Sequence, residues 1–203
     1  MAWVKICGIT DEASLDAAVD GGADAVGFVL APNSPRTITV DRAADLMRAV
    51  PIARFIVTVD LTPSEALAAA ELTGADGIQN HGLHATGVAA EAVDAGYLSL
   101  HPVRVLPTGP ETDISSIPAQ SLPLFDTASG SGHGGTGITF DWHVLDSPGR
   151  PYVLAGGLGP DNVAAAIAAL DPFGVDASSR LESSPGVKDP SSIVDFIHEA
   201  KAR

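Results

Sequence analysis

Short runs of hydrophobic residues alternate along this chain with segments in which hydrophobic residues recur every three or four positions. Short apolar runs bounded by glycine, proline or polar residues are typical of buried strands, and the wider spacing is typical of amphipathic helices. Ala43, Leu46, Met47 and Val50, for example, fall on one helix face. The apolar runs predict strands at residues 4–9, 25–30, 54–59, 77–81, 98–106, 122–126, 152–155 and 174–176.

Helix signals follow nearly every predicted strand. The sequence Thr62-Pro63-Ser64-Glu65 is a capping box with proline at the first helical position. Thr10 or Asp11 can cap an earlier helix, Gly159-Pro160 can begin a later one, and Asp189 can cap the last one. Residues 107–118 carry Pro, Gly and Thr where a helix is due, so we expect only a short or degenerate helix there.

Strands that alternate with helices predict a parallel sheet, and eight such units predict an α/β fold, a compact (β/α)8 TIM barrel. We expect a single domain over residues 1–203. The tripeptide Gly-Ala-Asp ends at both Asp24 and Asp76, before the second and fourth predicted strands, which favours internal repetition. An open doubly wound sheet is the alternative, but it has no natural place for eight units of such even length.

The segment 122–142 carries the strongest local signal. An apolar run ends in Asp126, a loop with five glycines between residues 130 and 137 follows, and a short helix is expected near residues 141–142. A buried strand that delivers an acid, followed by bare backbone N–H groups, is suited to an anionic ligand. A flexible linker is the alternative, although linkers seldom lie between a strand and a helix within a domain.

Composition narrows the function classes. The net charge is −14 and the 11 Lys and Arg residues are scattered, so we expect neither nucleic acid nor an anionic membrane as a partner. The apolar stretches are too short to span a membrane, and the N-terminus lacks a signal-peptide pattern, so we expect a cytoplasmic protein. The histidines and the single cysteine do not form a metal-binding motif, so we expect no metal.

In a (β/α)8 barrel the chemistry lies at the carboxyl-terminal ends of the strands. Each candidate there also has a structural interpretation: a buried apolar thiol, a core histidine, an exposed ion pair or a helix cap. The loops after the seventh and eighth strands usually bind phosphate in this fold, which favours phosphate at Gly156, Gly157, Ser178 and Ser179. The candidates are Cys7, Arg36, His81, Asp126, Gly156, Gly157, Asp176, Ser178 and Ser179.

Several motifs, in order from residue 4 to the end, resemble the phosphoribosylanthranilate isomerase family. They include the opening Lys5-Ile6-Cys7-Gly8, the segment Gly134-Gly135-Thr136-Gly137 with Phe140-Asp141-Trp142, and the closing Asp176-Ala177-Ser178-Ser179. The chain departs from the family at Arg180, where a glycine is usual, and at Asn80, where an apolar residue is usual.

The resemblance implies a cofactor-free isomerase of tryptophan biosynthesis that performs an Amadori rearrangement on a phosphorylated small molecule. It implies Cys7 as the base and Asp126 as the acid. Arg36 would hold the anthranilate carboxylate with His81 nearby, Asp176 would contact sugar hydroxyls, and Arg180 could either strengthen or obstruct phosphate binding. We expect Lys5 and the helix start after Thr10 to favour the Cys7 thiolate, and a low-dielectric pocket to keep Asp126 protonated.

Two alternatives remain open. One is another phosphosugar isomerase of the same fold, such as aminoimidazole-carboxamide ribotide isomerase or a dual-substrate form. Such an enzyme would require an aspartate at the position of Cys7. A non-catalytic phosphosugar-binding barrel would predict loss of the acid, the base or the phosphate loop. We expect a monomer, with a homodimer as the alternative.

Overall fold

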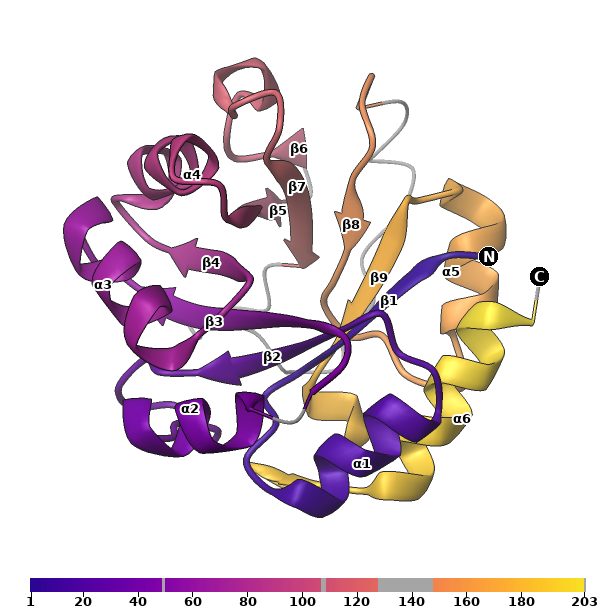
Figure 1. Ribbon diagram of the computed structural model, residues 1–203. Coiled ribbons are helices and arrows are strands. Elements are labelled where there is room, and N and C mark those ends of the chain that lie inside the picture. The colour runs from indigo at the N-terminus through magenta and orange to yellow at the C-terminus, as the bar shows by residue number, and fades with distance from the viewer. Residues whose placement is uncertain (49, 107–108, 128–147, 203) are drawn as a thin grey trace.

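The computed structural model describes residues 1–48, 50–106, 109–127 and 148–202. The glycine-rich loop and the helix predicted near residues 141–142 lie outside these ranges. Eight parallel strands form a closed ring in the order β1, β2, β3, β4, β5, β7, β8, β9, with β9 pairing back to β1. The (β/α)8 barrel predicted from the sequence is therefore confirmed, and Figure 1 shows the helices outside the ring.

The barrel strands agree closely with the predicted ones. They are β1 (Trp3–Cys7), β2 (Ala25–Val29), β3 (Ala53–Val59), β4 (Gly77–His81), β5 (Leu98–Leu106), β7 (Leu122–Thr127), β8 (Val153–Leu154) and β9 (Gly174–Ala177). The α-helices of the described ranges are α1 (Glu12–Asp20), α2 (Val40–Met47), α3 (Pro63–Thr73), α4 (Ala85–Asp94), α5 (Val163–Leu170) and α6 (Pro190–Lys201).

Short elements complete the described chain. Where the sequence predicted a degenerate helix, strand β6 (Gly109–Pro110) pairs antiparallel with β5, and the 3-10 helix η1 (Ile114–Ser116) follows. After β9 come the 3-10 helix η3 (Ser179–Leu181) and an antiparallel hairpin of β10 (Glu182–Ser184) and β11 (Val187–Lys188). Sequence analysis did not predict this hairpin.

Local signals set the starts of α1 and α3 as expected. Asp11 caps α1 by accepting from the Ser14 N–H, and Thr62 and Glu65 form the reciprocal capping box of α3. Helix α5 begins at Val163, three residues after the predicted start at Pro160. None of the helices in the described ranges is both long and apolar enough to cross a membrane.

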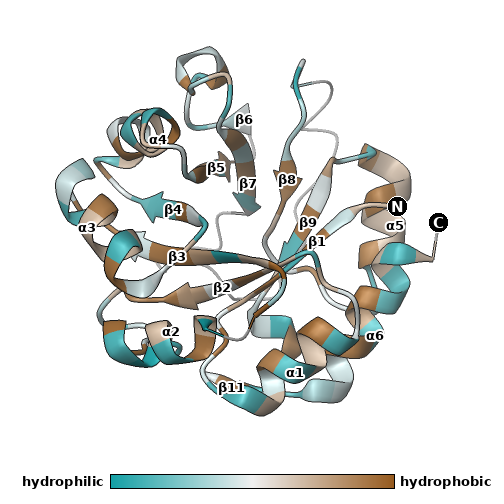
Figure 2. Cartoon of the chain, in the orientation of Figure 1, coloured by the Kyte–Doolittle hydropathy of each residue, from teal (hydrophilic) through white to brown (hydrophobic). Residues whose placement is uncertain are grey.

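The hydrophobic core has an outer layer and an inner layer. The outer layer lies between the strands and the helices and includes Phe28, Phe125 and Phe196, all with no exposed surface. Inside the barrel, Phe55, Leu100 and Leu124 pack together towards the amino-terminal ends of the strands. Figure 2 shows β2 and β3 as largely hydrophobic, whereas the helices carry hydrophilic stretches as well.

The Gly-Ala-Asp repeat has a structural cause. In its first copy the Asp24 carboxylate accepts from the Val4 N–H at 2.7 Å, and the Asp24 N–H donates to the Val4 carbonyl at 2.9 Å. In its second copy Asp76 makes the same two bonds with Arg54, at 3.0 and 2.8 Å. Each aspartate therefore fixes the start of the neighbouring strand, so the repeat reflects one turn used twice.

We expect the substitution Asp76→Ala to lower the free energy of unfolding by about 1–3 kcal/mol, because it removes hydrogen bonds to a strand end. Hydrogen bonds from Arg54 lower the pKa of Asp76. The stabilisation is therefore complete above the ordinary aspartate pKa of about 3.9 and is lost as the pH falls through the lowered folded-state value.

Urea unfolding at several pH values checks this prediction. Asp94→Ala is the matched control, since Asp94 is an exposed aspartate at the end of α4. An equal effect of the two substitutions, or an effect of Asp76→Ala that persists at low pH, would contradict the assignment.

Candidate active site

All the sequence-predicted site residues lie at the carboxyl-terminal ends of barrel strands or in the loops that follow them. Cys7 and His81 end β1 and β4, while Asp126 and Asp176 each lie one residue before the end of their strands. Because the barrel strands are parallel, these ends share one rim. The loop residues are Arg36 after β2, Gly156 and Gly157 after β8, and Ser178 and Ser179 after β9.

A buried polar centre lies inside the barrel. The Lys5 Nζ atom is 2.9 Å from Asp176 Oδ1 and 2.9 Å from Gln79 Oε1, and the Lys5 side chain has no exposed surface. Burial acts to lower the pKa of Lys5, but the charges of Asp176 and Cys7 outweigh it and raise that pKa. Lys5 is therefore a fixed positive charge in the barrel interior.

Sequence analysis missed Gln79. Its side chain bridges the buried centre and the rim, since Gln79 Nε2 lies 2.9 Å from His81 Nε2. The available signal was strand alternation, because residues two apart on a strand share a face. Alternation alone would have placed this polar residue, two positions before His81 on a predicted barrel strand, on the interior face.

Asn80 has no part in this interior surface. Its amide accepts from the Thr58 hydroxyl at 2.7 Å and donates to the Leu61 carbonyl at 3.2 Å. Asn80 lies between Gln79 and His81 and so faces the opposite side of β4. The departure from the family at this position therefore concerns the loop after β3, not the lining beside His81.

Cys7 is buried beside Lys5. The sulfur of Cys7 and the Nζ of Lys5 both lie against Gly27 on β2, 3.1 and 3.2 Å from where a Cβ atom would stand. Burial raises the pKa of the Cys7 thiol, and Lys5 opposes that rise. Lys5 therefore acts in the expected direction, but the net shift is upward because burial outweighs the ion's charge.

Asp126 is the corresponding residue of β7. Leu124, two residues earlier, belongs to the apolar cluster inside the barrel, so alternation directs Asp126 to the same interior face. The Asp126 side chain is only partly buried. In the ring, β8 and β9 separate β7 from β1, so Asp126 and Cys7 approach the barrel mouth from different sides.

The loops after β8 and β9 are adjacent because those strands pair directly. Gly156 and Gly157 have φ values of +86° and +64°, which favour glycine. The Arg180 Nη1 atom donates to the Gly157 carbonyl at 3.2 Å, and its Nη2 atom donates to both carboxylate oxygens of Asp161, at 2.8 Å each. Arg180 thus ties the two predicted phosphate loops together.

Arg36 belongs to a charged network at the same rim. Its Nε and Nη2 atoms donate to the two carboxylate oxygens of Glu182, at 2.5 and 2.9 Å. Lys188 donates to the same Glu182 carboxylate at 2.9 Å and to the Ser178 carbonyl at 2.9 Å. Burial acts to raise the pKa of Glu182, but the hydrogen bonds from Arg36 and Lys188 outweigh it, so that pKa is lowered.

Gly8 allows these parts to meet over the end of β1. Its φ is +79°, and a Cβ atom there would lie 2.5 Å from Arg36 Cδ and 3.0 Å from Ser178 Oγ. A side chain at position 8 would therefore be strained and would displace Arg36. The glycine after Cys7 brings the loop of Arg36 and the loop of Ser178 into contact.

Four cations gather at the rim of this acidic protein, and each is paired with a carboxylate. Lys5, Arg36, Arg180 and Lys188 are four of the 11 Lys and Arg residues and all lie in or beside the barrel mouth. In the part of the chain that the structure describes, no group of three or more His, Cys, Asp and Glu residues is arranged to hold a metal ion. An anionic ligand at the barrel mouth would therefore be held by these local cations, because the field of the whole negatively charged protein opposes it.

Fold and site together define a (β/α)8-barrel protein that carries an aspartate, a buried thiol and two adjacent loops, with the glycine pair and the serine pair, at one rim. Residues 4–199 match the family model described as N-(5'phosphoribosyl)anthranilate (PRA) isomerase. The chain is 39% identical to the N-(5'-phosphoribosyl)anthranilate isomerase of Rubrobacter xylanophilus over the full length of both. It therefore belongs to the N-(5'-phosphoribosyl)anthranilate isomerase family and is an isomerase.

Solved structures agree with this assignment. The phosphoribosyl anthranilate isomerase of Thermotoga maritima is 35% identical, with a TM-score of 0.86 and full coverage of both chains. A second isomerase structure, 33% identical with a TM-score of 0.82 and full coverage of both chains, is a complex with reduced 1-(o-carboxyphenylamino)-1-deoxyribulose 5-phosphate.

Proposed function

We propose that the protein converts N-(5'-phosphoribosyl)anthranilate into 1-(2-carboxyphenylamino)-1-deoxyribulose 5-phosphate, in tryptophan biosynthesis, with Cys7 as base and Asp126 as acid. The observation that carries this proposal is family membership together with the joint presence of Cys7, Asp126 and the two glycine and serine loops at one rim. The other phosphosugar isomerases are disfavoured, because they would want an aspartate at the position of Cys7.

The first step is opening of the furanose. Asp126 donates a proton to the ring oxygen, the C1′–O bond breaks, and the nitrogen lone pair forms a C=N bond. A carboxylic acid can do this at neutral pH only if its surroundings keep it protonated. The partly buried position of Asp126 at the barrel rim supports this role.

The second step is proton removal from C2′. The Cys7 thiolate takes that proton, and the electron pair moves into a C1′=C2′ bond while the C=N bond becomes a neutral amine. The enolamine then loses its C2′ hydroxyl proton and gains a proton at C1′. This step gives the ketone with no net change in the number of protons. The thiolate form is the more demanding requirement, because burial raises the pKa of Cys7.

The remaining site residues bind the substrate. Arg36 holds the anthranilate carboxylate, with His81 beside it, and Asp176 contacts sugar hydroxyls through groups not engaged with Lys5. Gly156, Gly157, Ser178 and Ser179 bind the phosphate. The adjacency of β8 and β9 and the link from Arg180 to the Gly157 carbonyl support one shared phosphate site.

Turnover of freshly generated N-(5'-phosphoribosyl)anthranilate, followed as loss of anthranilate-type fluorescence, tests the proposed function. We expect steady turnover by the wild-type protein. A folded protein that binds phosphosugars without turnover would instead support the non-catalytic binding barrel.

The Cys7 thiol is expected to titrate above its ordinary pKa of about 8.5 in the ligand-free protein. Its alkylation by iodoacetamide should therefore accelerate with rising pH well beyond neutrality. Because Lys5 lowers the pKa of Cys7, the Lys5→Met variant should shift the midpoint further upward. Cys7 is the single cysteine, so the labelling rate reports one thiol.

Arg42→Met serves as the control, since Arg42 pairs with the exposed Glu12 on the protein surface. The control should leave the alkylation midpoint unchanged. An ordinary thiol pKa in the wild type, or no shift in Lys5→Met, would contradict the assigned balance between burial and charge.

A further inference from the structure

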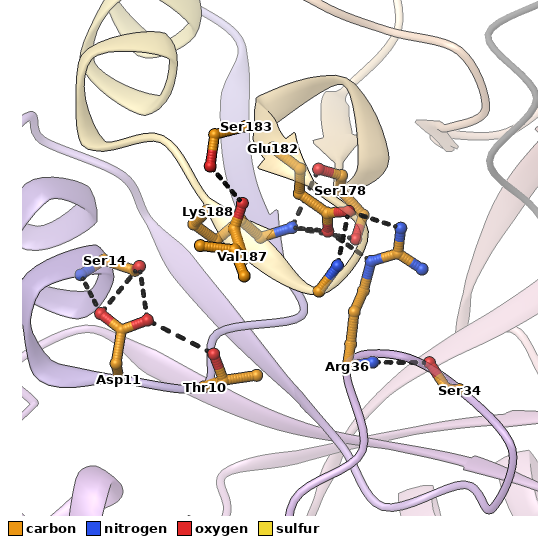
Figure 3. Close-up of polar contacts among 11 residues, drawn as sticks. Thr10, Asp11, Ser14, Ser34, Arg36, Ser178, Glu182, Ser183, Val187 and Lys188 are labelled. Atoms are coloured by element: carbon orange, nitrogen blue, oxygen red, sulfur yellow. Dashed lines mark hydrogen bonds and ion pairs between the residues drawn. The ribbon is translucent and has the colours of Figure 1, made fainter.

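The contact between Arg36 and Glu182 leaves part of the guanidinium available at the mouth. Glu182 engages Nε and Nη2, the side edge of the fork. Figure 3 shows the remaining nitrogen, Nη1, pointing away from Glu182. A guanidinium has five N–H donors, so it can hold one carboxylate at its side and another at its end.

Glu182 is itself held rigidly. Its side chain is only 4% exposed and receives Lys188 Nζ at 2.9 Å and the Gly186 N–H at 3.1 Å. Glu182 and Lys188 are register partners in the β10–β11 hairpin. Figure 3 shows Arg36 and Lys188 converging on this carboxylate from opposite sides.

The hairpin also packs against the loop that carries Arg36. Gly186, at the turn, has a φ of +83°, and a Cβ atom there would lie 2.2 Å from the Pro35 carbonyl oxygen. Lys188 donates as well to the carbonyl and hydroxyl of Ser178, at 2.9 and 3.2 Å. The hairpin therefore touches both the loop of Arg36 and the predicted phosphate loop.

We propose that Glu182 is a positioning residue. It binds the Nε and Nη2 side of the Arg36 guanidinium, so that the Nη1 end meets the aromatic carboxylate of the substrate. Through Lys188, Glu182 also fixes the Arg36 side chain relative to Ser178. This inference rests on the proposed function, in which Arg36 binds the anthranilate carboxylate. A long, flexible arginine that is ordered before binding loses less conformational entropy when the ligand arrives. Glu182 thus favours ligands in which a carboxylate and a phosphate are a fixed distance apart.

The test compares two ligands on the full-length protein. One is reduced 1-(o-carboxyphenylamino)-1-deoxyribulose 5-phosphate, and the other is the same molecule with hydrogen in place of the ring carboxylate. The ratio of their Kd values measures the carboxylate contact, because effects on the shared phosphate cancel. We expect Glu182→Gln to reduce the preference for the carboxylated ligand by about tenfold.

A double-mutant cycle identifies the route. In an Arg36→Met background, Glu182→Gln should change the ratio by less than about twofold, because the contact it positions is already gone. An unchanged ratio in the Glu182→Gln single variant, or an equal change in both backgrounds, would overturn the proposal. Glu12→Gln is the matched control, since it breaks the fork that Glu12 forms with Arg42, with both bonds 2.7 Å long, on the surface.

Removing Glu182 leaves Lys188 buried without its carboxylate, so the single variant can be unstable. Glu182→Gln combined with Lys188→Met removes both charges. This double variant should lose the preference for the carboxylated ligand by about tenfold, as the single variant does. Turnover by the wild type is measured separately. Absence of that turnover with an intact ligand preference would reject the proposed function, whereas normal turnover with an unchanged ratio in both Glu182 variants would reject only the positioning role.

Discussion

Cys7→Ala and Asp126→Asn are each expected to reduce kcat for N-(5'-phosphoribosyl)anthranilate by about a hundredfold to ten-thousandfold, the usual contribution of general acid–base groups. The two groups act in different steps, so neither can take over the role of the other. Cys7→Ala removes the only thiol, and Asp126→Asn keeps the shape of the side chain while removing its ability to donate a proton.

Steady-state kinetics together with binding of the reduced product analogue check this prediction. The analogue needs no proton transfer, so both variants should bind it within about threefold of the wild type. Asn80→Ala is a suitable control on a barrel strand, because Asn80 faces away from the interior. Retention of wild-type kcat by either variant would remove that residue from the proposed mechanism.

Lys5→Met is expected to lower the free energy of unfolding by about 3–5 kcal/mol at neutral pH, as is typical when one partner of a buried ion pair is removed. The variant leaves the Asp176 carboxylate in the barrel interior without the charge 2.9 Å away. Combining Lys5→Met with Asp176→Leu should recover much of the loss, because no uncompensated charge then remains buried.

The pH dependence of this loss follows from the same argument. In Lys5→Met a lone buried carboxylate titrates with a raised folded-state pKa. The stability of the variant is highest below the unfolded-state aspartate pKa of about 3.9, where Asp176 is protonated in both states. It is lost as the pH rises through the raised pKa of Asp176 in the folded state. The variant should therefore be nearer to the wild type at pH ~5 than at pH ~8, in urea unfolding.

Lys201→Met provides a matched comparison, since Lys201 pairs with Asp24 at the same distance of 2.9 Å but with both side chains partly exposed. Its cost should stay below about 1 kcal/mol, the usual range for exposed pairs. Equal costs for the two lysine substitutions would show that burial does not determine the importance of Lys5.

Much of the fold was predictable because its signals are local. Burial imposes a short apolar run on each barrel strand and a three-to-four spacing on each helix, and capping residues mark the helix starts. The capping box at Thr62 and Glu65 formed as predicted. The start of α5 was predicted three residues early, since the first turn after Pro160 depends on Asn162, which binds Gly159 and Gly157.

The sequence by itself determined the eight-unit barrel, the strand ends that carry Cys7, His81, Asp126 and Asp176, and the two glycine and serine loops. Only the tertiary structure decided how these parts are paired. Lys5 binds Asp176 across 171 residues of chain, and Arg36 binds Glu182 across 146. Such contacts have no local signal, because closing the ring of strands is what brings their partners together. The sequence thus predicted which residues line the rim, and barrel closure determined which charges hold those residues in place.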